Sequence, residues 1–378
     1  MADLSNLADF LDPLNLDELS HDEGYREGQI GRHIVAWQQE FPDLSEADLV
    51  LVGCGEERGG GMGRTDLTGP NAIRHQFYSL YHWHKSLALA DVGNVRTGAT
   101  LADTHAALKT VVSELIEAGK TVVILGGSHD LTLAQYDAYR HLNRTIEATG
   151  IDSLINLSID TPRKSDSFLM EMLTGEPNFI RHYNHIGFQS YFVHPHMLET
   201  MDKLRFDCFR LGVVKERIEE MEPVIRNSHM VSFDIAALSH AAAPSNYVSP
   251  NGLSGEDACT LMRFAGMSPV LTSIGIYGYE VGHDVQQLTA KQAAQMIWYF
   301  TEGRGRGLHE AKLADKENFL EFHTVFAEVD TVFMQSKRTG RWWMQLPSKK
   351  YIACSYQDYL MASSNEIPER WLRAQERS

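Results

Sequence analysis

Short apolar runs alternate with amphipathic helical patterns between Asp48 and about residue 303. The longer runs are continuous, as in LVLVG (49–53), TVVILGG (121–127), SLINLSI (153–159), HMVSFDI (229–235) and LTSIGIYG (271–278), with shorter ones near Ala88 and Ile186. Continuous apolar runs are typical of parallel strands that are covered on both faces. The segment 101–118 has apolar residues at helical spacing and ends near Gly119. The pattern predicts a three-layer α/β/α fold around a doubly wound parallel sheet.

The pattern changes at both ends of this region. Residues 1–47 are acidic and polar, and we expect a lead-in there with one helix over 28–39. After EGRGRG (302–307), two β-prone segments flank Arg338-Thr339-Gly340, which predicts a hairpin, and the tail after Ser355 predicts a helix. We therefore predict an α/β domain over 48–303 and a C-terminal extension over 304–378 that packs on this domain or on a neighbouring subunit.

Charge and composition narrow the classes of partner. The 34 basic and 50 acidic residues give a formal charge of -16, which disfavours binding to the phosphate backbone of nucleic acids and to anionic lipid. No run of about 18 apolar residues is present, so we expect no membrane span. The four cysteines form no CxxC pair, which suits a reducing compartment. We expect a cytoplasmic protein that binds neither nucleic acid nor a membrane.

Candidate chemistry lies where the predicted strands end, because ligands of an open parallel sheet gather beyond the carboxyl ends of its strands. The segments GGSHDLT (126–132), INLSIDTP (155–162) and SFDIAALSH (232–240) place His129, Asp160 and Asp234 there. Each residue alone is as readily explained by a turn or a helix cap. Together, one imidazole and two carboxylates at neighbouring strand ends predict an acidic metal pocket. Asp130 is a candidate N-cap for a helix beginning near Leu131.

With GPNAIR (69–74) and Glu280 in YGYEVGHD, these segments resemble the arginase or ureohydrolase family, which includes arginase, agmatinase and formimidoylglutamase. The resemblance spans roughly residues 48–303, and GGSHDLT is its most specific motif. It implies a hydrolase that cleaves a carbon-nitrogen bond of a small cationic amidine or guanidino substrate at a dinuclear manganese site. It also implies a homo-oligomer, a trimer or a hexamer. Two residues would serve catalysis: Glu280 would hold the cationic group of the substrate, and Asp130 would orient His129.

The departures from the family motifs concern the metal ligands. Residues 156–160 are set against the family's DAHxD and residues 232–240 against its SxDxDxxDP. The six ligand positions then read His129, Asn156, Ser158, Asp160, Asp234 and Ala236. The first ion would be held by His129, Asn156, Asp160 and Asp234, whereas the second would retain one carboxylate. We therefore predict a half-site with one divalent ion, manganese first, with zinc, nickel or no metal as alternatives.

Two functions stay open at this point. The first is a metal-dependent hydrolase similar to formimidoylglutamase that works with a single ion. The second is a catalytically inactive protein that keeps the ureohydrolase fold as a binding or assembly module. Three lost ligands favour the second function, and the residues kept at the strand ends favour the first. The sequence leaves open whether the chain is an enzyme and which substrate it takes.

Overall fold

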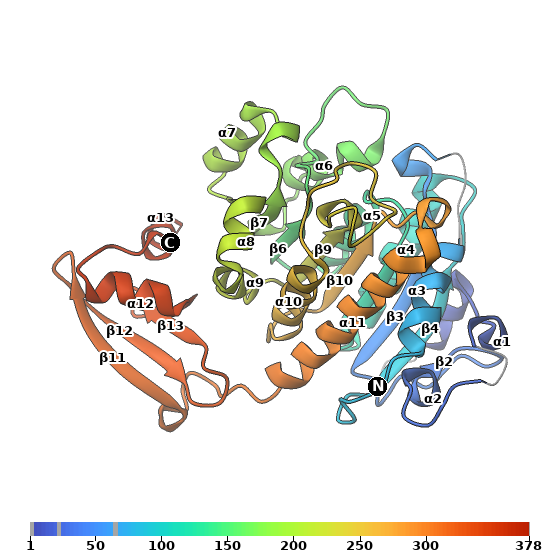
Figure 1. The fold of residues 1–378 in the computed structure, drawn as a ribbon, viewed down its shortest axis with the longest axis horizontal. Helices are drawn as coiled ribbons and strands as arrows, with labels where there is room; N and C mark the ends of the chain where they lie inside the picture. The colour runs from blue at the N-terminus through green and yellow to red at the C-terminus, as the bar shows by residue number, and fades with distance from the viewer. Residues whose placement is uncertain (1–3, 21–23, 63–66, 378) are drawn as a thin grey trace.

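The computed structural model describes residues 4–20, 24–62 and 67–377 (Figure 1). Within them, a ten-stranded sheet has the order β1-β4-β3-β5-β10-β9-β6-β7-β8, and β2 pairs with β4. The pairings are parallel except that of β1 with β4. The strands are β1 (Leu11–Asp12), β2 (Val35–Ala36), β3 (Leu49–Cys54), β4 (Leu89–Val95), β5 (Thr121–Gly126), β6 (Ile146–Ile151), β7 (Ile180–Phe188), β8 (Asp207–Arg210), β9 (Met230–Asp234) and β10 (Ser273–Tyr277).

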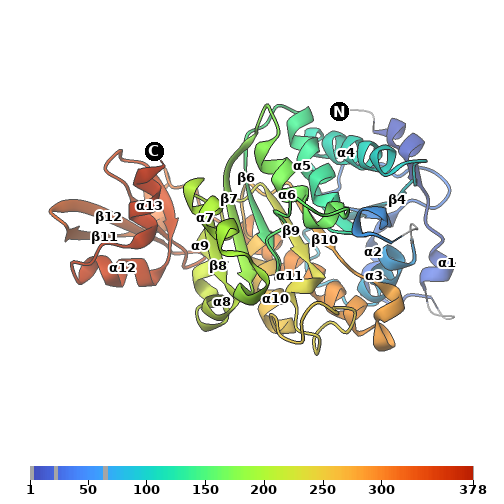
Figure 2. The same ribbon diagram turned by 90° about the horizontal axis from the view of Figure 1, so that it is seen from above.

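Helices cover both faces of this sheet (Figures 1 and 2). One face carries α4 (Leu101–Glu117), α5 (Leu131–His141) and α6 (Phe168–Thr174). The other face carries α3 (Thr68–Tyr78), α10 (Gly255–Gly266) and α11 (Leu288–Gly307). Shorter helices are α1 (Leu16–Leu19), α2 (Ile30–His33), α7 (Pro195–Lys203), α8 (Leu211–Glu216) and α9 (Met221–Ile225). None of the described helices combines the length and apolar character needed to cross a membrane.

Side chains of the central strands alternate between two hydrophobic cores, one under each helix layer. In β3, Leu49 and Leu51 point into the core beneath α3, whereas Val50 and Val52 point into the core beneath α4. A strand buried on both faces has no polar face, which explains its continuous apolar run. The three-layer α/β/α fold predicted from these runs is confirmed.

Two predicted elements are wrong. The run at 153–159 is not a strand, because the strand of this region is β6, over Ile146–Ile151. Ile155 and Leu157 are buried in the core from an irregular segment, so their apolar character does not report extended pairing. The predicted helix over 28–39 is reduced to the four residues of α2, and Val35 joins the sheet beside Ala90.

The GPNAIR segment has a structural role at the start of α3. Arg74 is fully buried, and its Nε and Nη2 atoms lie 2.8 and 3.0 Å from the two carboxylate oxygens of Asp91 in β4. The hydroxyl of Tyr78 donates to the same carboxylate at 2.7 Å. A buried ion pair is tolerated when its remaining polar atoms are hydrogen-bonded. This network fixes α3 on the sheet.

The C-terminal extension forms a second, antiparallel sheet in the order β11-β12-β13-β14. Its strands are β11 (Phe319–Phe326), β12 (Val329–Ser336), β13 (Trp342–Gln345) and β14 (Tyr351–Cys354), followed by α12 (Tyr356–Ser363) and α13 (Glu369–Glu376). The hairpin predicted around Thr339 is confirmed as β12 and β13, and Gly340 takes the positive φ of 75° in its turn. The boundary predicted at 303 falls inside α11, which continues to Gly307.

The extension contacts the large sheet at the amino ends of its strands. Asp207, the first residue of β8, pairs with Arg373 of α13 and lies 2.9 Å from Nη1 of Arg377. Arg226, which precedes β9, donates to the carbonyl of Trp342 at 2.6 Å, and its guanidinium lies 4.5 Å from the ring centroid of Trp343. The carboxyl ends of the strands lie on the opposite side of the sheet and take no part in these contacts.

Candidate metal centre

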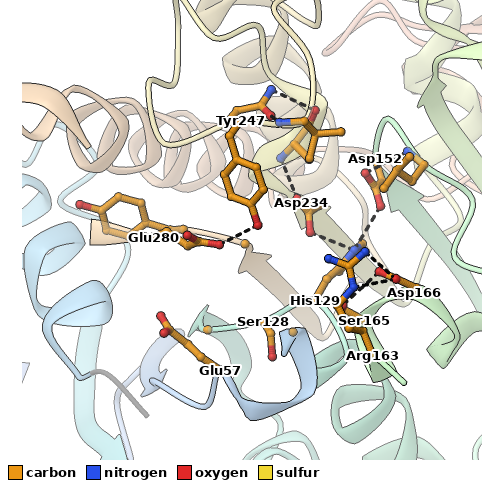
Figure 3. A pocket seen from close by; sticks show the side chains of 18 of the residues that line it. Glu57, Ser128, His129, Asp152, Arg163, Ser165, Asp166, Asp234, Tyr247 and Glu280 are labelled. Carbon is orange, nitrogen blue, oxygen red and sulfur yellow. Dashed lines mark hydrogen bonds and ion pairs between the residues drawn. The ribbon is translucent and has the colours of Figure 1, made fainter. Parts of the chain in front are cut away.

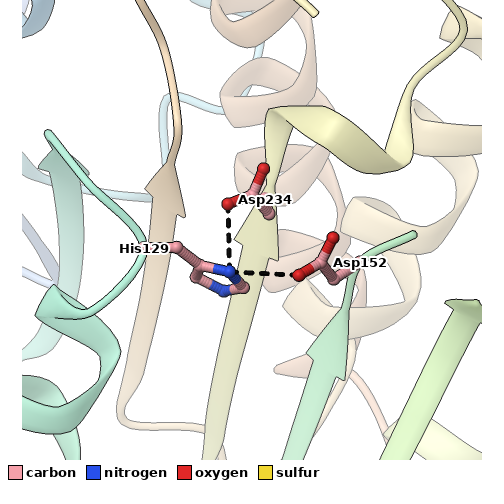
Figure 4. Close-up of side chains that lie close together, drawn as sticks. All are labelled: His129, Asp152 and Asp234. Atoms are coloured by element: carbon pink, nitrogen blue, oxygen red, sulfur yellow. Dashed lines mark ion pairs between the residues drawn. The ribbon is translucent and has the colours of Figure 1, made fainter. Parts of the chain in front are cut away.

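Three side chains converge at the carboxyl ends of β5, β9 and β6, where β9 and β6 are adjacent and β10 lies between β5 and β9 (Figure 4). His129 follows β5, Asp152 directly follows β6, and Asp234 is the last residue of β9. Nδ1 of His129 lies 3.2 Å from Oδ2 of Asp152 and 3.0 Å from Oδ2 of Asp234. All three residues are buried, and their potential ligand atoms lie within 4.8 Å of one another. One imidazole and two carboxylates so placed form a candidate metal centre.

Two features of the loop after β5 orient His129. A Cβ at Gly127 would lie 2.2 Å from the carbonyl oxygen of Glu56, so this loop approaches the loop after β3 only with glycine there. Nε2 of His129 lies 3.0 Å from Oγ of Ser232, which is 2.6 Å from Oγ1 of Thr132. An Nε2–H donated to Ser232 leaves Nδ1 as the ring nitrogen that faces the carboxylates.

The carboxylate of Asp234 is held by the turn that follows β9. Its Oδ1 accepts the backbone N–H of Ala236 at 2.6 Å, which leaves Oδ2 toward His129. Gly278 packs against this carboxylate with a φ of +74°, and a Cβ there would lie 2.7 Å from Oδ1. The glycine of the YGYE segment therefore makes room for a candidate ligand.

The three groups shift one another's proton affinity. Burial disfavours the imidazolium form, but the carboxylates of Asp234 and Asp152 outweigh it and raise the pKa of His129 to about 10. Burial also disfavours the charged form of Asp152, yet its hydrogen bond to His129 holds the pKa of Asp152 below the ordinary value. The pKa of Asp234 is raised because burial dominates. Without a metal, the proton on His129 offsets carboxylate charge in the centre, and a divalent cation bound there would take the place of that proton.

Three of the four metal ligands predicted from the sequence, His129, Asn156 and Asp234, lie close together in the structure. His129 and Asp234 face each other, and Nδ2 of Asn156 lies 2.7 Å from Oδ2 of Asp152 and 3.3 Å from Nδ1 of His129. Asp160 is exposed and does not belong to the cluster, in which Asp152 stands instead. The strand predicted over 153–159 ends after the true strand, β6. The DAHxD motif was therefore compared with residues 156–160, four residues too far along the chain. With β6 in place, the motif falls on Asp152-Ser153-Leu154-Ile155-Asn156.

Asp130 occupies the predicted N-cap position of α5, but its side chain makes no capping hydrogen bond. Its carboxylate accepts the hydroxyl of Ser128 at 2.5 Å and lies 2.9 Å from Nε2 of His105. A Cβ at Gly59 would lie 2.0 Å from this carboxylate, so Asp130 packs directly beneath the loop that follows β3. The residue that contacts the far nitrogen of His129 is Ser232, whereas the sequence had predicted Asp130.

The cluster lies in a pocket of about 290 Å³ whose opposite wall contains Glu280 (Figure 3). Oε1 of Glu280 accepts the hydroxyl of Tyr247 at 3.0 Å, and Oε2 lies 2.8 Å from Nδ1 of His283. Burial and the neighbouring Glu280 raise the pKa of Tyr247 to about 12, so its hydroxyl remains a donor. Arg163 also lines the pocket, paired with Asp166 at 2.9 Å.

Asp152, Tyr247 and Arg163 were missed in the sequence. One signal was available for Asp152, because it stands four residues before Asn156, the spacing between the two aspartates of DAHxD. Tyr247 and Arg163 lie in irregular segments, where neither periodicity nor a motif reports which side chains enter a pocket.

Comparison with known proteins agrees with this architecture. The model of the Arginase family matches residues 47–302. Formimidoylglutamase from Staphylococcus haemolyticus is 26% identical over 247 residues, which cover 61% of this chain and 78% of that protein. Formimidoylglutamase from Lysinibacillus sphaericus is 23% identical over 299 residues, which cover 75% of this chain and 92% of that protein.

Solved structures share the fold at low sequence identity. Formimidoylglutamase from Bacillus subtilis superposes with a TM-score of 0.65 at 16% identity, covering 73% of this chain and 92% of that one. Trypanosoma cruzi formiminoglutamase with Mn²⁺ gives 0.64 at 19% identity, covering 70% and 96%. Agmatine ureohydrolase of Thermoplasma volcanium gives 0.59 at 20% identity, covering 74% and 95%. With the strand-end cluster and the match over residues 47–302, the chain belongs to the arginase family.

Proposed function

We propose that this protein is a metal-dependent hydrolase of a linear amidine, similar to formimidoylglutamase, and that it works with a single divalent ion. The observation that carries the proposal is the placement of the His129, Asp152 and Asp234 cluster opposite Glu280 in one pocket. Such a pocket offers a cation-binding centre at one wall and a carboxylate for a cationic substrate group at the other. The relatives with this name support the substrate class.

The donor set fits one divalent ion. An imidazole nitrogen and two carboxylates suit manganese, zinc or nickel, and half a turn of the Asn156 amide would add an oxygen ligand. The second ion of the family would depend on Asp152, Asp234 and the positions of Leu154 and Ala236. An isobutyl group and a methyl group donate no electron pair, which supports a half-site.

The bound ion and the residues of the pocket would have separate roles in hydrolysis. A bound divalent ion supplies a Lewis acid that makes water a competent nucleophile near neutral pH. Glu280 would hold the amidinium group of the substrate, and the hydroxyl of Tyr247 and the ring of His283 fix the orientation of that carboxylate. Ser232 keeps the ring of His129 aligned with the two aspartates.

Metal content and turnover test the proposal together. Protein purified without chelator should carry one divalent ion per chain by elemental analysis. With manganese, zinc or nickel added, a panel of formiminoglutamate, arginine, agmatine and guanidinobutyrate should show turnover of formiminoglutamate. Two bound ions would contradict the half-site. Binding of the amidine without turnover under any of these metals would instead identify an inactive binding module.

A substitution in the opposite wall separates binding of substrate from binding of metal. Glu280→Gln should lower kcat/KM by about a hundredfold, because the amidinium loses a charge-assisted partner, and it should leave the metal content unchanged.

The oligomeric state is part of the proposal as well. We expect a homo-oligomer, a trimer or a hexamer, and light scattering after size-exclusion chromatography measures it.

A further inference from the structure

The small sheet of the C-terminal extension has one edge turned toward the large domain and one edge free. In the order β11-β12-β13-β14, Arg226 of the large domain donates to the carbonyls of Trp342 in β13 and Cys354 in β14. β11 is the edge strand on the other side (Figure 1). We propose that β11 pairs antiparallel with β11 of a second copy of this chain, so that the two small sheets join into one.

The backbone of β11 presents a row of outward hydrogen-bonding groups. The carbonyl of Asn318, just before β11, accepts the N–H of Lys337 at 2.9 Å, and the register of β11 with β12 has no shift. Bonded and non-bonded residue pairs alternate along an antiparallel ladder, so the even-numbered residues of β11 bond to β12. Among the described residues, the other backbone groups pair with no strand, namely those of Phe319, Glu321, His323 and Val325.

β11 lacks several features that keep edge strands from pairing. It contains no proline and no lysine, and its pairing with β12 shows no bulge that would twist the edge away. Leu320 is 46% exposed and Val325 is 61% exposed. A long, regular edge with exposed apolar side chains is a template for a further strand.

The sequence of β11 is complementary to itself, which points to a second copy as the partner. A two-fold axis perpendicular to the sheet relates two antiparallel strands and keeps each face of the joined sheet continuous. Since the outward groups belong to odd-numbered residues, odd-numbered residues lie opposite one another. One such register places Glu321 opposite His323 on both sides of the axis, where an imidazole N–H can donate to the carboxylate. Val325 then lies opposite Phe319.

The two neighbouring registers are less favourable. A shift by two residues places either Glu321 opposite Glu321 or His323 opposite His323, and like charges directly opposite each other are destabilising. In the favoured register, Phe322 lies opposite its own copy on the other face of the sheet. Its ring is 5.1 Å from that of Trp342 and 5.2 Å from that of Tyr359, so an aromatic cluster would continue across the axis.

This contact is separate from the α/β domain and its pocket. The match to the Arginase family covers residues 47–302, and β11 lies beyond them. The proposal is therefore independent of the metal centre and of the proposed hydrolysis. A closed two-fold contact joins chains in pairs, so the assembly contains an even number of chains. A trimer built by the α/β domains would become a hexamer.

Sedimentation velocity of the full chain tests the proposal, and we expect a particle with an even number of chains. His323→Pro should halve that number, because it removes an outward N–H while the bonds from β11 to β12 are kept. An unchanged thermal unfolding midpoint by circular dichroism would show that the variant is folded. An odd number of chains in the natural protein, or an unchanged mass for folded His323→Pro, would overturn the proposal.

A charge exchange tests the register and decides the question if His323→Pro does not fold. His323→Glu should raise the dissociation constant of the contact by about tenfold, because it places glutamates opposite each other. Adding Glu321→Lys should restore association, since each glutamate then faces a lysine. Asp330→Lys, at an exposed carboxylate on the inner strand β12, is the matched control and should leave association unchanged. Failure of the double variant to restore association, or an equal loss in the control, would overturn the proposed pairing.

Discussion

At the candidate metal centre, one imidazole nitrogen faces two carboxylates whose pKa values are shifted in opposite directions. The pKa of Asp152 is lowered by its hydrogen bond to His129, whereas burial raises that of Asp234. The pKa of His129 is raised to about 10 by the two acids, although burial opposes it. A divalent cation would replace the proton of His129, so metal binding is expected to release protons and to weaken as pH falls.

Asp152 can be tested directly as a ligand. Asp152→Asn should weaken binding of the divalent ion by at least about a hundredfold, because it removes one of the two carboxylates that offset the charge. Calorimetric titration of metal-free protein with Mn²⁺ measures the change. The matched control is Asp160→Asn, which alters an exposed carboxylate and should leave the affinity unchanged. The reverse result would restore the register predicted from sequence.

The proposed loss of the second ion can be tested by rebuilding its ligands. A triple variant with Leu154→His, Asn156→Asp and Ala236→Asp should bind two ions per chain, since it supplies an imidazole and two carboxylates around Asp152 and Asp234. Elemental analysis after dialysis gives the count. Asn156→Asp alone serves as the control and should stay at one ion. A triple variant that still binds one ion would show that ligand identity does not limit the count.

At the scale of elements, the sequence predicted the buried strands that read as continuous apolar runs, and it missed the buried strand β6, which is interrupted by polar residues. β3 and β5 were predicted because both of their faces are buried, so each reads as one apolar run. β6 contains Glu147 and Thr149 and was overlooked, since its place between β7 and β9 depends on pairing with distant segments. This error affected the predicted site, because His129 and Asp234 lie after or at the ends of correctly predicted strands, whereas Asp152 follows the missed strand.

Helix α13 is held by an ionic cluster that makes its attachment depend on pH. Burial opposes ionisation of Asp207, but the hydrogen bond from His182 and the charges of Arg377 and Arg373 hold the pKa of Asp207 below its ordinary value. Because the folded pKa is the lower one, ionised Asp207 stabilises the fold above the unfolded pKa of about 4. This contribution is lost as pH falls through the folded value.

Asp207→Asn should therefore lower the free energy of unfolding near neutral pH, and the difference from the natural chain should shrink below about pH 4. Urea denaturation followed by circular dichroism across that range measures it. Asp202→Asn is the control, because Asp202 is an exposed partner of the same Arg373 at 3.5 Å and should give little change at any pH. A difference for Asp207→Asn that is constant with pH would exclude this mechanism.

At the scale of the whole molecule, the candidate metal centre and the contacts of the C-terminal extension lie at opposite ends of the strands of one sheet. The candidate metal centre lies at the carboxyl ends of β5, β6 and β9, and the extension packs where β7, β8 and β9 begin. The junction is buried and polar: Arg226 pairs with Glu222 and stacks on Trp343. Its stability therefore depends on charges being matched.

Arg226→Ala should destabilise the protein by about 3–5 kcal/mol, because it leaves the buried carboxylate of Glu222 with one distant partner. Urea unfolding followed by tryptophan fluorescence, which includes the signal of Trp343, gives the value. Arg217→Ala is the matched control, as Arg217 is exposed and its contact with Glu216 is 3.9 Å, and it should cost less than about 1 kcal/mol. Equal effects of the two substitutions would mean that the junction contributes nothing specific.

The distance between the C-terminal extension and the candidate metal centre also matters when the protein is immobilised. Figure 1 shows the C-terminal extension at one side of the large domain, and its contacts lie where β8 and β9 begin, so capture of the protein through the extension would leave the carboxyl ends of β5, β6 and β9 uncovered. The candidate metal centre would then stay accessible to substrate after capture.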